Sequence, residues 1–136
     1  MKFLVDANVL SEATKLLPAA EVVNWLLDHR REIAVNPIVL GELEYGIVIL
    51  PASRRRRQLQ QWFASAIKTL PVVDIDANTS RIWAMLLADL KRKGRAMPVK
   101  DSLIAASARQ FGLTVATRNV SDYRYADVPI ENPFEP

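Results

Sequence analysis

The chain has 136 residues, which suits one domain with a buried core, so we expect a single domain over residues 1–136. It contains no cysteine, which excludes disulfides, thiolate metal sites and a cysteine nucleophile and fits the reducing cytoplasm. The sequence shows neither a signal peptide nor an apolar run of about 18 residues, so we expect no membrane span. The net charge of +3 and a pI near 9.4 favour an anionic partner.

The first half of the chain alternates short apolar runs with amphipathic segments. Residues 2–6 are the first predicted strand, in which three apolar residues, Phe3 to Val5, run directly into Asp6, a pattern typical of a strand buried on both faces. Asn8 is expected to cap a short helix that runs to residue 13. Beyond it, the pattern predicts helices over 21–31, 37–50 and 53–69, and a short strand over 33–35.

The second half continues the alternation. The pattern predicts a strand over 70–75, a helix from Asp76 or Asn78 to Gly94, a helix over 98–111 that ends at Gly112, and a strand over 113–117. A loop or helical turn follows over 119–125, and residues 128–130 are a candidate fifth strand. Strands that alternate with helices to the end of the chain predict an α/β fold: a three-layer α/β/α sandwich around a parallel sheet of four to five strands.

Four acidic residues are expected to meet at one edge of this sheet. Asp6 directly follows the first strand, and Asp122 lies in the loop five residues after the fourth. Glu42 lies about 60° from the apolar stripe of its helix, whereas Glu44 lies about 130° away and is expected in solvent. Asp101 is again about 60° off the stripe of its helix, in the first turn. The carboxyl ends of strands in open α/β sheets line the ligand crevice, so these acids are candidates for a functional site.

Clustered carboxylates do not all stay ionised unless cations compensate them. Mg²⁺ and Mn²⁺ suit carboxylate and water ligands, and such a site activates water for attack on a phosphodiester. This chemistry requires neither cysteine nor histidine, and the single histidine, His29, is expected on a surface helix.

Each of these acids also has a structural interpretation. Asp6 fits a turn after a strand, and Glu42 fits a surface or ion-paired position. Asp101 stabilises a first helical turn through the helix dipole alone. Asp122 lies three residues after Asn119, where it fits a capping arrangement. Periodicity and spacing leave both interpretations open.

Four segments, in order along nearly the whole chain, carry a family resemblance. They are residues 4–12 (LVDANVLSE), 36–46 (NPIVLGELEYG), 101–108 (DSLIAASA) and 116–123 (ATRNVSDY). Together they resemble PIN domains, and among these the VapC toxin ribonucleases of toxin–antitoxin systems, including their FitB-like branch.

The resemblance implies an α/β/α sandwich and a Mg²⁺- or Mn²⁺-dependent endoribonuclease. The acids of the family's catalytic site fall on Asp6, Glu42, Asp101 and Asp122. Of these, Asp6 and Asp101 match metal ligands, while the other two complete the site directly or through water. Asn8 and Thr117 match polar positions that orient a carboxylate or a substrate phosphate.

The match has two small departures, and it also implies partners. Ala7 stands where many relatives carry a hydroxyl residue, and Tyr123 stands where phenylalanine is commoner. The implied partners are an RNA substrate, a cognate antitoxin that blocks the site and a second copy of the chain in a homodimer. DNA is implied only indirectly, through the antitoxin.

Basic residues form two stretches whose roles stay open. Residues 54–57 are four arginines, which fit either a solvated helix start or a contact with RNA, an acidic partner or a second subunit. The stretch over 91–100 is placed to hold an RNA backbone by charge. Arg118 is placed to touch phosphate, and no ladder of aromatic residues for base stacking is evident.

Two other function classes compete with the nuclease. One is a FitB-like regulatory or binding module that acts with a DNA-binding antitoxin and has little or no turnover. The other is a phosphatase or a phosphoacceptor receiver. A phosphatase of that kind is expected to carry a second aspartate two residues after Asp6, where this chain has Asn8, and the acid pair and lysine of a receiver are not found.

Overall fold

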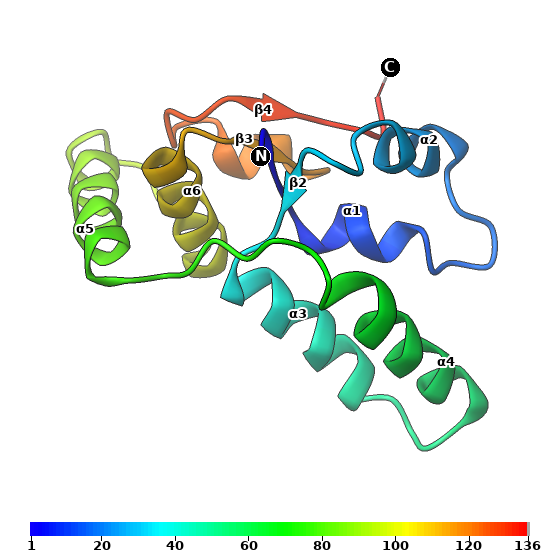
Figure 1. Cartoon of the computed structure of the whole chain (residues 1–136). Helices are drawn as coiled ribbons and strands as arrows, with labels where there is room; N and C mark the ends of the chain where they lie inside the picture. Colours follow the sequence, from blue (N-terminus) through cyan, green and yellow to red (C-terminus); the bar gives the residue numbers. More distant parts are fainter. Residues whose placement is uncertain (136) are drawn as a thin grey trace.

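The computed structural model describes residues 1–135, and a four-stranded parallel sheet lies at its centre (Figure 1). The strands are β1 (Phe3–Val5), β2 (Ile33–Ala34), β3 (Thr114–Ala116) and β4 (Ile130–Glu131). Their order is β2-β1-β3-β4, so β1 and β3 are the central pair. The predicted α/β architecture is confirmed. The predicted domain limit at residue 136 lies outside the described residues, and the single-domain organisation stays a prediction.

Helices surround this sheet. They are α1 (Ala7–Glu12), α2 (Ala20–Asp28), α3 (Pro37–Val48), α4 (Arg54–Trp62), α5 (Ala77–Arg92) and α6 (Val99–Phe111). The π-helical turn η1 (Phe63–Ile67) extends α4, and the 3₁₀ turn η2 (Val120–Tyr123) follows β3. In Figure 1, α5 and α6 lie on one side of the sheet and α1 and α2 on the other, while α3 and α4 extend away as a hairpin. No helix within residues 1–135 is long and apolar enough to span a bilayer.

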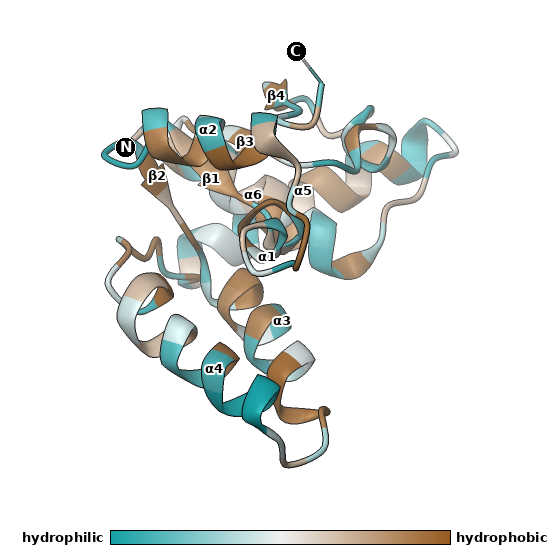
Figure 2. Ribbon diagram, turned by 90° about the vertical axis from the view of Figure 1, so that its right-hand side faces the viewer, coloured by the Kyte–Doolittle hydropathy of each residue, from teal (hydrophilic) through white to brown (hydrophobic). Residues whose placement is uncertain are grey.

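The central strand β1 is buried on both faces, as its apolar run predicted. Phe3, Leu4 and Val5 are almost fully inaccessible, and Figure 2 shows the strands as hydrophobic segments beside helices that mix hydrophilic and hydrophobic residues. Burial of each such side chain contributes about 2 kcal/mol to folding. A strand packed from both sides therefore holds the residue that follows it, Asp6, in a fixed position.

The predicted strand over 70–75 is wrong. Only Val72 pairs there, in an isolated parallel bridge with Val35 beside β2. The Val35 backbone N–H donates to the Pro71 carbonyl, and the Val73 N–H donates to the Val35 carbonyl, at 3.0 and 2.8 Å. Pro71 has no N–H to extend the ladder, and Val72 and Asp74 are exposed, so the apolar run makes an edge contact and not a strand.

Two of the predicted helix caps are confirmed, whereas the helices predicted to end at residues 31 and 50 end at Asp28 and Val48. Asn36 caps α3 by accepting from the Val39 N–H at 3.0 Å, and Gly112 ends α6 at a φ of 65°. Asn8, however, does not cap α1; the Asp6 side chain does so. The C-cap of α2, His29, is half-buried against Phe3 and Trp25 instead of lying free on the surface.

Candidate active site

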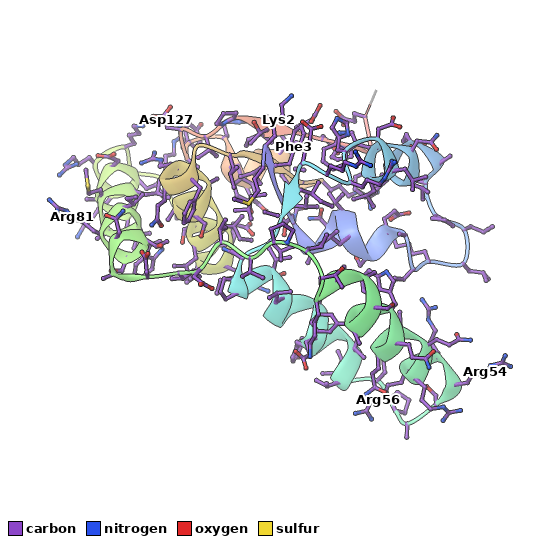
Figure 3. All side chains as sticks on the ribbon, in the orientation of Figure 1. Lys2, Phe3, Arg54, Arg56, Arg81 and Asp127 are labelled. Carbon is purple, nitrogen blue, oxygen red and sulfur yellow. The ribbon has the colours of Figure 1, made fainter. Side chains whose placement is uncertain are left out.

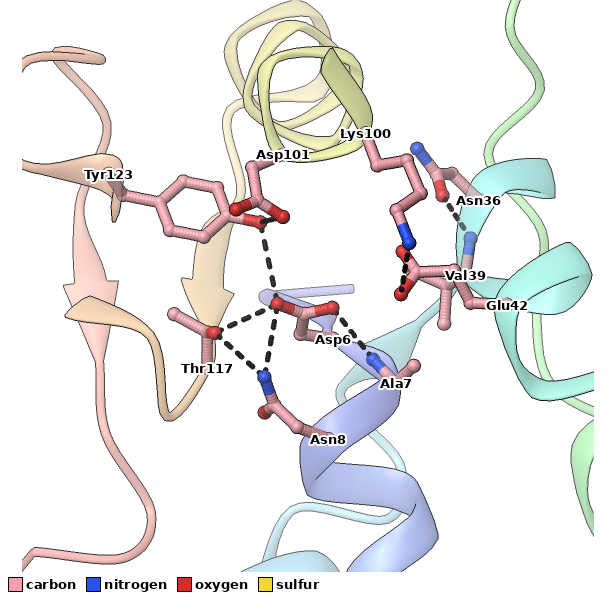
Figure 4. Close-up of polar contacts among 10 residues, drawn as sticks. All are labelled: Asp6, Ala7, Asn8, Asn36, Val39, Glu42, Lys100, Asp101, Thr117 and Tyr123. Carbon is pink, nitrogen blue, oxygen red and sulfur yellow. Dashed lines mark hydrogen bonds and ion pairs between the residues drawn. The ribbon is translucent and has the colours of Figure 1, made fainter. Parts of the chain in front are cut away.

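The centre of the site is the pair formed by Asp6 and Thr117 at the ends of β1 and β3. Val5 and Ala116 are register partners in the sheet, so the residues that follow them are neighbours. Thr117 Oγ1 donates to Asp6 Oδ2 at 2.8 Å, and the Ala7 N–H donates to Asp6 Oδ1 at 2.8 Å (Figure 4). Asp6 is 3% exposed and Thr117 is fully buried. Burial and the two donors fix the Asp6 carboxylate rigidly.

Asn8 joins the same hydrogen-bond network from the first turn of α1. Its Nδ2 lies 3.4 Å from both Asp6 Oδ2 and Thr117 Oγ1. Its Oδ1 accepts from the Arg118 backbone N–H at 3.1 Å, which fastens α1 to the segment after β3. The two polar residues predicted beside the acids are thus both in contact with Asp6.

The first turn of α6 brings Asp101 to the cluster. Trp83 of α5 donates from its indole N–H to Ser102 Oγ at 2.8 Å, and Ser102 Oγ donates to the Val99 carbonyl at 2.6 Å. These bonds anchor the turn that carries Asp101, which is 9% exposed. The Tyr123 hydroxyl lies between the two aspartates, 3.4 Å from Asp6 Oδ2 and 3.5 Å from Asp101 Oδ1.

Glu42 approaches from α3, on the other side of Asp6 (Figure 4). Asn36 fixes the start of this helix, because its Nδ2 donates to Ser107 Oγ of α6 at 3.1 Å while its oxygen caps α3. Lys100 Nζ lies 3.6 Å from Glu42 Oε2. The other oxygen, Oε1, is buried and has no hydrogen-bond partner among the described residues.

Burial and neighbouring negative charges raise the pKa values of several side chains in the cluster, and Asp101 is affected by the other three acids. Burial, together with the negative charges of Asp6, Asp122 and Glu42, raises the pKa of Asp101 to about 6. Burial also raises the pKa of Asp6, and burial together with the charge of Asp6 raises that of Glu42. Burial and the nearby acids raise the pKa of Tyr123, so its phenol stays protonated and acts as a donor.

Asp122 completes the set from η2. It is half-buried, and its charge acts on Asp101 as described. The alternative of a cap with Asn119 is not supported, since Asn119 makes no side-chain capping bond to η2 in the described structure. All four predicted acids therefore belong to one electrostatically coupled cluster, whereas Glu44 is exposed as expected.

The cluster has the chemistry of a hard-cation site. Its candidate metal ligands are carboxylate oxygens, and Glu42 Oε1 is buried without a partner among the described residues. Burial raises the pKa of Asp6, Glu42 and Asp101, and neighbouring acids raise it further at Glu42 and Asp101. A divalent cation bound there would offset the cost of ionising these buried carboxylates and would give Glu42 Oε1 a partner. Within residues 1–135, however, no three acidic or histidine side chains already converge as a complete metal-binding set. The Tyr123 hydroxyl and the Lys100 ammonium lie among the acids instead.

Two residues of the site were not singled out from the sequence. Tyr123 was noted only as a departure from a family pattern, although a polar-tipped aromatic directly after Asp122 was a signal. Lys100 was treated as part of a basic stretch, although its place next to Asp101 brings it to the acids. Both bring a further hydrogen-bond donor to the carboxylate oxygens of the site.

Among the described residues, the side chains of Arg54, Arg55 and Arg118 take no part in this network, although the Arg118 backbone does. Arg54 extends from the far end of α4 into solvent (Figure 3). Arg55 Nη2 donates to the Thr14 carbonyl at 2.5 Å, which ties α4 to the end of α1. The Arg118 guanidinium lies 4.6 Å from the ring centre of Phe134. Contact of these arginines with RNA or a partner stays a prediction.

Comparison with known proteins decides the family. The match to the PIN domain family covers residues 3–128. The chain belongs to the PIN domain family. This PIN domain is 34% identical over 139 residues to VapC ribonuclease Y4jK of Sinorhizobium fredii, a match that covers 98% of each chain. It is 31% identical to toxin FitB of Neisseria gonorrhoeae, over 96% of this chain and 97% of FitB.

Solved structures agree with this PIN domain closely. The crystal structure of FitAcB from Neisseria gonorrhoeae superposes with a TM-score of 0.92 at 30% identity, over 98% of this chain and 99% of that one. FitAB bound to the IR36 DNA fragment also superposes at 0.92, with 28% identity, over 98% of this chain and 96% of that one. The predicted resemblance to PIN domains of the VapC and FitB type is confirmed.

Proposed function

We propose that this PIN domain is the toxin of a type II toxin–antitoxin system and cleaves RNA as a metal-dependent endoribonuclease. The observation that carries the proposal is the convergence of the charges of three acids on a fourth, Asp101, whose pKa rises to about 6. Ionising clustered, buried carboxylates costs free energy unless a cation compensates them. With a bound cation, the same carboxylates form a site that can activate water for attack on a phosphodiester. Relatives named VapC ribonuclease and toxin FitB support the same activity.

The metal is proposed to be Mg²⁺ or Mn²⁺, held by Asp6 and Asp101 with Glu42 and Asp122 completing the site. A cation there supplies positive charge that makes an attacking water more acidic and offsets the charge that grows on the phosphate. Carboxylate ligands favour these ions over softer ones.

The residues of the chain supply orientation and charge control. Thr117 and the Ala7 N–H hold the two oxygens of Asp6 in a fixed orientation. Asn8 links this carboxylate to the segment that carries Arg118. We propose that its amide also orients a substrate phosphate. The protonated Tyr123 phenol donates between Asp6 and Asp101 and so limits their repulsion.

The proposed partners follow from the relatives. FitAB was solved with a DNA fragment, and VapBC complexes of Rickettsia felis and Salmonella typhimurium were also solved bound to DNA. We propose a cognate antitoxin that covers the active site, DNA contact only through that antitoxin, and a homodimer. The proposed location is the cytoplasm.

Incubation of the purified chain with structured and unstructured RNA tests this function. Cleavage that requires Mg²⁺ or Mn²⁺ and stops with EDTA is expected. A clean protein that cuts no RNA but shifts promoter DNA together with its antitoxin would instead indicate a regulatory module. Mapping the RNA ends produced on induced expression then identifies the target.

A further inference from the structure

A groove of about 510 Å³ opens beside the active site, between the start of α6 and the exposed face of α3. Its lining consists of Pro37, Ile38, Gly41, Glu42, Tyr45 and Lys100. Glu42 is one of the four clustered acids, and Lys100 is its ion-pair partner, so the groove is continuous with the site. Its volume is in the range of sites for small organic ligands, which is about 300 to 1,000 Å³.

Two groups in the groove have the chemistry that recognises a nucleotide. The Tyr45 side chain is 65% exposed, and its ring presents an aromatic surface on α3. The Lys100 side chain is also 65% exposed, although its ammonium lies 3.6 Å from Glu42. An ammonium has three N–H donors, so the contact with Glu42 leaves donors for an anion. An aromatic ring can stack on a nucleotide base, and a cation beside that ring can pair with the phosphate of the same nucleotide.

Gly41 leaves space in front of the ring. It lies four residues before Tyr45, on the same face of α3. A Cβ built on Gly41 meets no other atom within 4 Å, so the surface there is open. A flat base therefore has room to lie along α3 beside the ring of Tyr45.

We propose that this groove binds one nucleotide of single-stranded RNA next to the scissile phosphate. Tyr45 stacks on the base, and Lys100 pairs with the backbone phosphate between the base and the acid cluster. Stacking accepts any base, so the subsite adds affinity and positioning with little sequence preference. The inference rests on the proposed ribonuclease function, because it assigns the position of that enzyme's substrate.

Binding in EDTA tests the subsite without cleavage. The probe is a labelled ten-nucleotide RNA, measured by fluorescence anisotropy against the full chain. Tyr45→Ala is expected to weaken binding about tenfold, and Tyr45→Phe to restore it, because stacking needs the ring and not the hydroxyl. With an RNA whose bases have been removed, Tyr45→Ala is expected to have no effect.

Charge and space are tested separately. Lys100→Gln is expected to reduce the dependence of log affinity on log salt by about 0.7, the value for one phosphate contact on a single strand. Lys68→Gln, which removes an exposed cation outside the groove, is the matched control and should change the slope little. Gly41→Leu fills the groove and is expected to weaken binding without lowering the melting temperature, since leucine favours the helix.

The outcomes separate this inference from the function on which it rests. If the wild type cleaves RNA with metal and Tyr45→Ala raises KM with kcat unchanged, the subsite is supported. If Tyr45→Ala binds and cleaves as the wild type does, the subsite is wrong and the nuclease stands. If Tyr45→Ala loses RNA binding and also has a lower molecular mass in solution than the wild type, the subsite is wrong. That result would mean that Tyr45 holds a second copy of the chain over the groove in the wild type. A wild type that cleaves no RNA contradicts the proposed function itself.

Discussion

Thr117 Oγ1 donates a 2.8 Å hydrogen bond to Asp6 Oδ2, although the two residues are 111 positions apart in the chain. The bond exists because β1 and β3 are adjacent and in register, so each strand delivers its next residue to the same point. The arrangement combines a rigid sheet with a carboxylate that burial makes costly to ionise. The catalytic proposal depends on this combination.

Thr117→Val removes that donor while the volume of the side chain is kept. Because it leaves a buried carboxylate oxygen with one donor fewer, we expect a loss of about 1 to 2 kcal/mol in the free energy of unfolding. The pKa of Asp6 is expected to rise further, since the Thr117 bond lowers it in the wild type. Urea unfolding measures the first effect, and Thr117→Ser, which keeps the hydroxyl, is the control. Equal stability of the valine and serine variants would contradict the importance of this bond.

Asp101→Asn is expected to stabilise the metal-free protein at neutral pH. The pKa of Asp101 is about 6 in the folded chain against an ordinary 3.8, so the folded state binds more protons between these values. Stability therefore falls as pH rises through this window, and ionised Asp101 costs roughly 3 kcal/mol at pH 7. The neutral amide removes this cost.

Thermal unfolding in EDTA at pH 7.5 and at pH 4 measures the difference in melting temperature between Asp101→Asn and the wild type. The variant should melt at a higher temperature than the wild type at pH 7.5, and the gap should shrink at pH 4. Asp74→Asn, at an exposed position, should change neither curve appreciably. A variant that is less stable than the wild type at pH 7.5 is the result that this account does not allow.

Tyr123→Phe removes the phenol that donates between the two aspartates. That hydrogen bond lowers the pKa of both Asp6 and Asp101, so its loss is expected to move both upward. For Asp101 we expect a pKa above the wild-type value of about 6. Carboxyl NMR titration of the metal-free protein measures it, and an unchanged or lower pKa would show that the phenol does not act as a donor.

Two glycines are expected to respond to alanine with opposite signs. Gly46 is in α3, and a Cβ there meets nothing within 4 Å, so Gly46→Ala should stabilise the protein by about 1 kcal/mol. Gly112 ends α6 at a φ of 65°, where Gly112→Ala should cost about 1 kcal/mol. Denaturant unfolding of both variants checks this pair, and effects of equal sign would contradict it.

The fold could be predicted from the sequence where local chemistry decides the structure. The apolar run before Asp6, the Asn36-Pro37 cap and Gly112 each act through their own backbone or burial, and the structure agrees with all three. The segment over 70–75 was mispredicted because apolar content alone does not show whether a partner strand continues past Pro71. Asn8 was mispredicted as a cap because Asp6, two residues earlier, competes for the same free N–H groups.

The site was predictable in composition but not in detail. Strand ends and helix phase selected Asp6, Glu42, Asp101 and Asp122, and the structure brings them together. Tyr123 and Lys100 are adjacent in the chain to Asp122 and Asp101, which pointed to the site. Their contacts with Asp6, Asp101 and Glu42 depend on how η2 and α6 pack against the sheet, which the sequence alone did not give. The ribonuclease activity came from the family resemblance, since a carboxylate cluster by itself fits more than one phosphoryl chemistry.

The most direct test of the central proposal is metal-dependent RNA cleavage by Asp6→Asn. Matched samples of the wild type, Asp6→Asn and Glu44→Gln are incubated with RNA in Mg²⁺, in Mn²⁺ and in EDTA, and initial rates are compared. The proposal predicts that Asp6→Asn loses at least about a hundredfold in rate while the exposed Glu44→Gln cleaves like the wild type. Metal-dependent cleavage that persists unchanged in Asp6→Asn would contradict it.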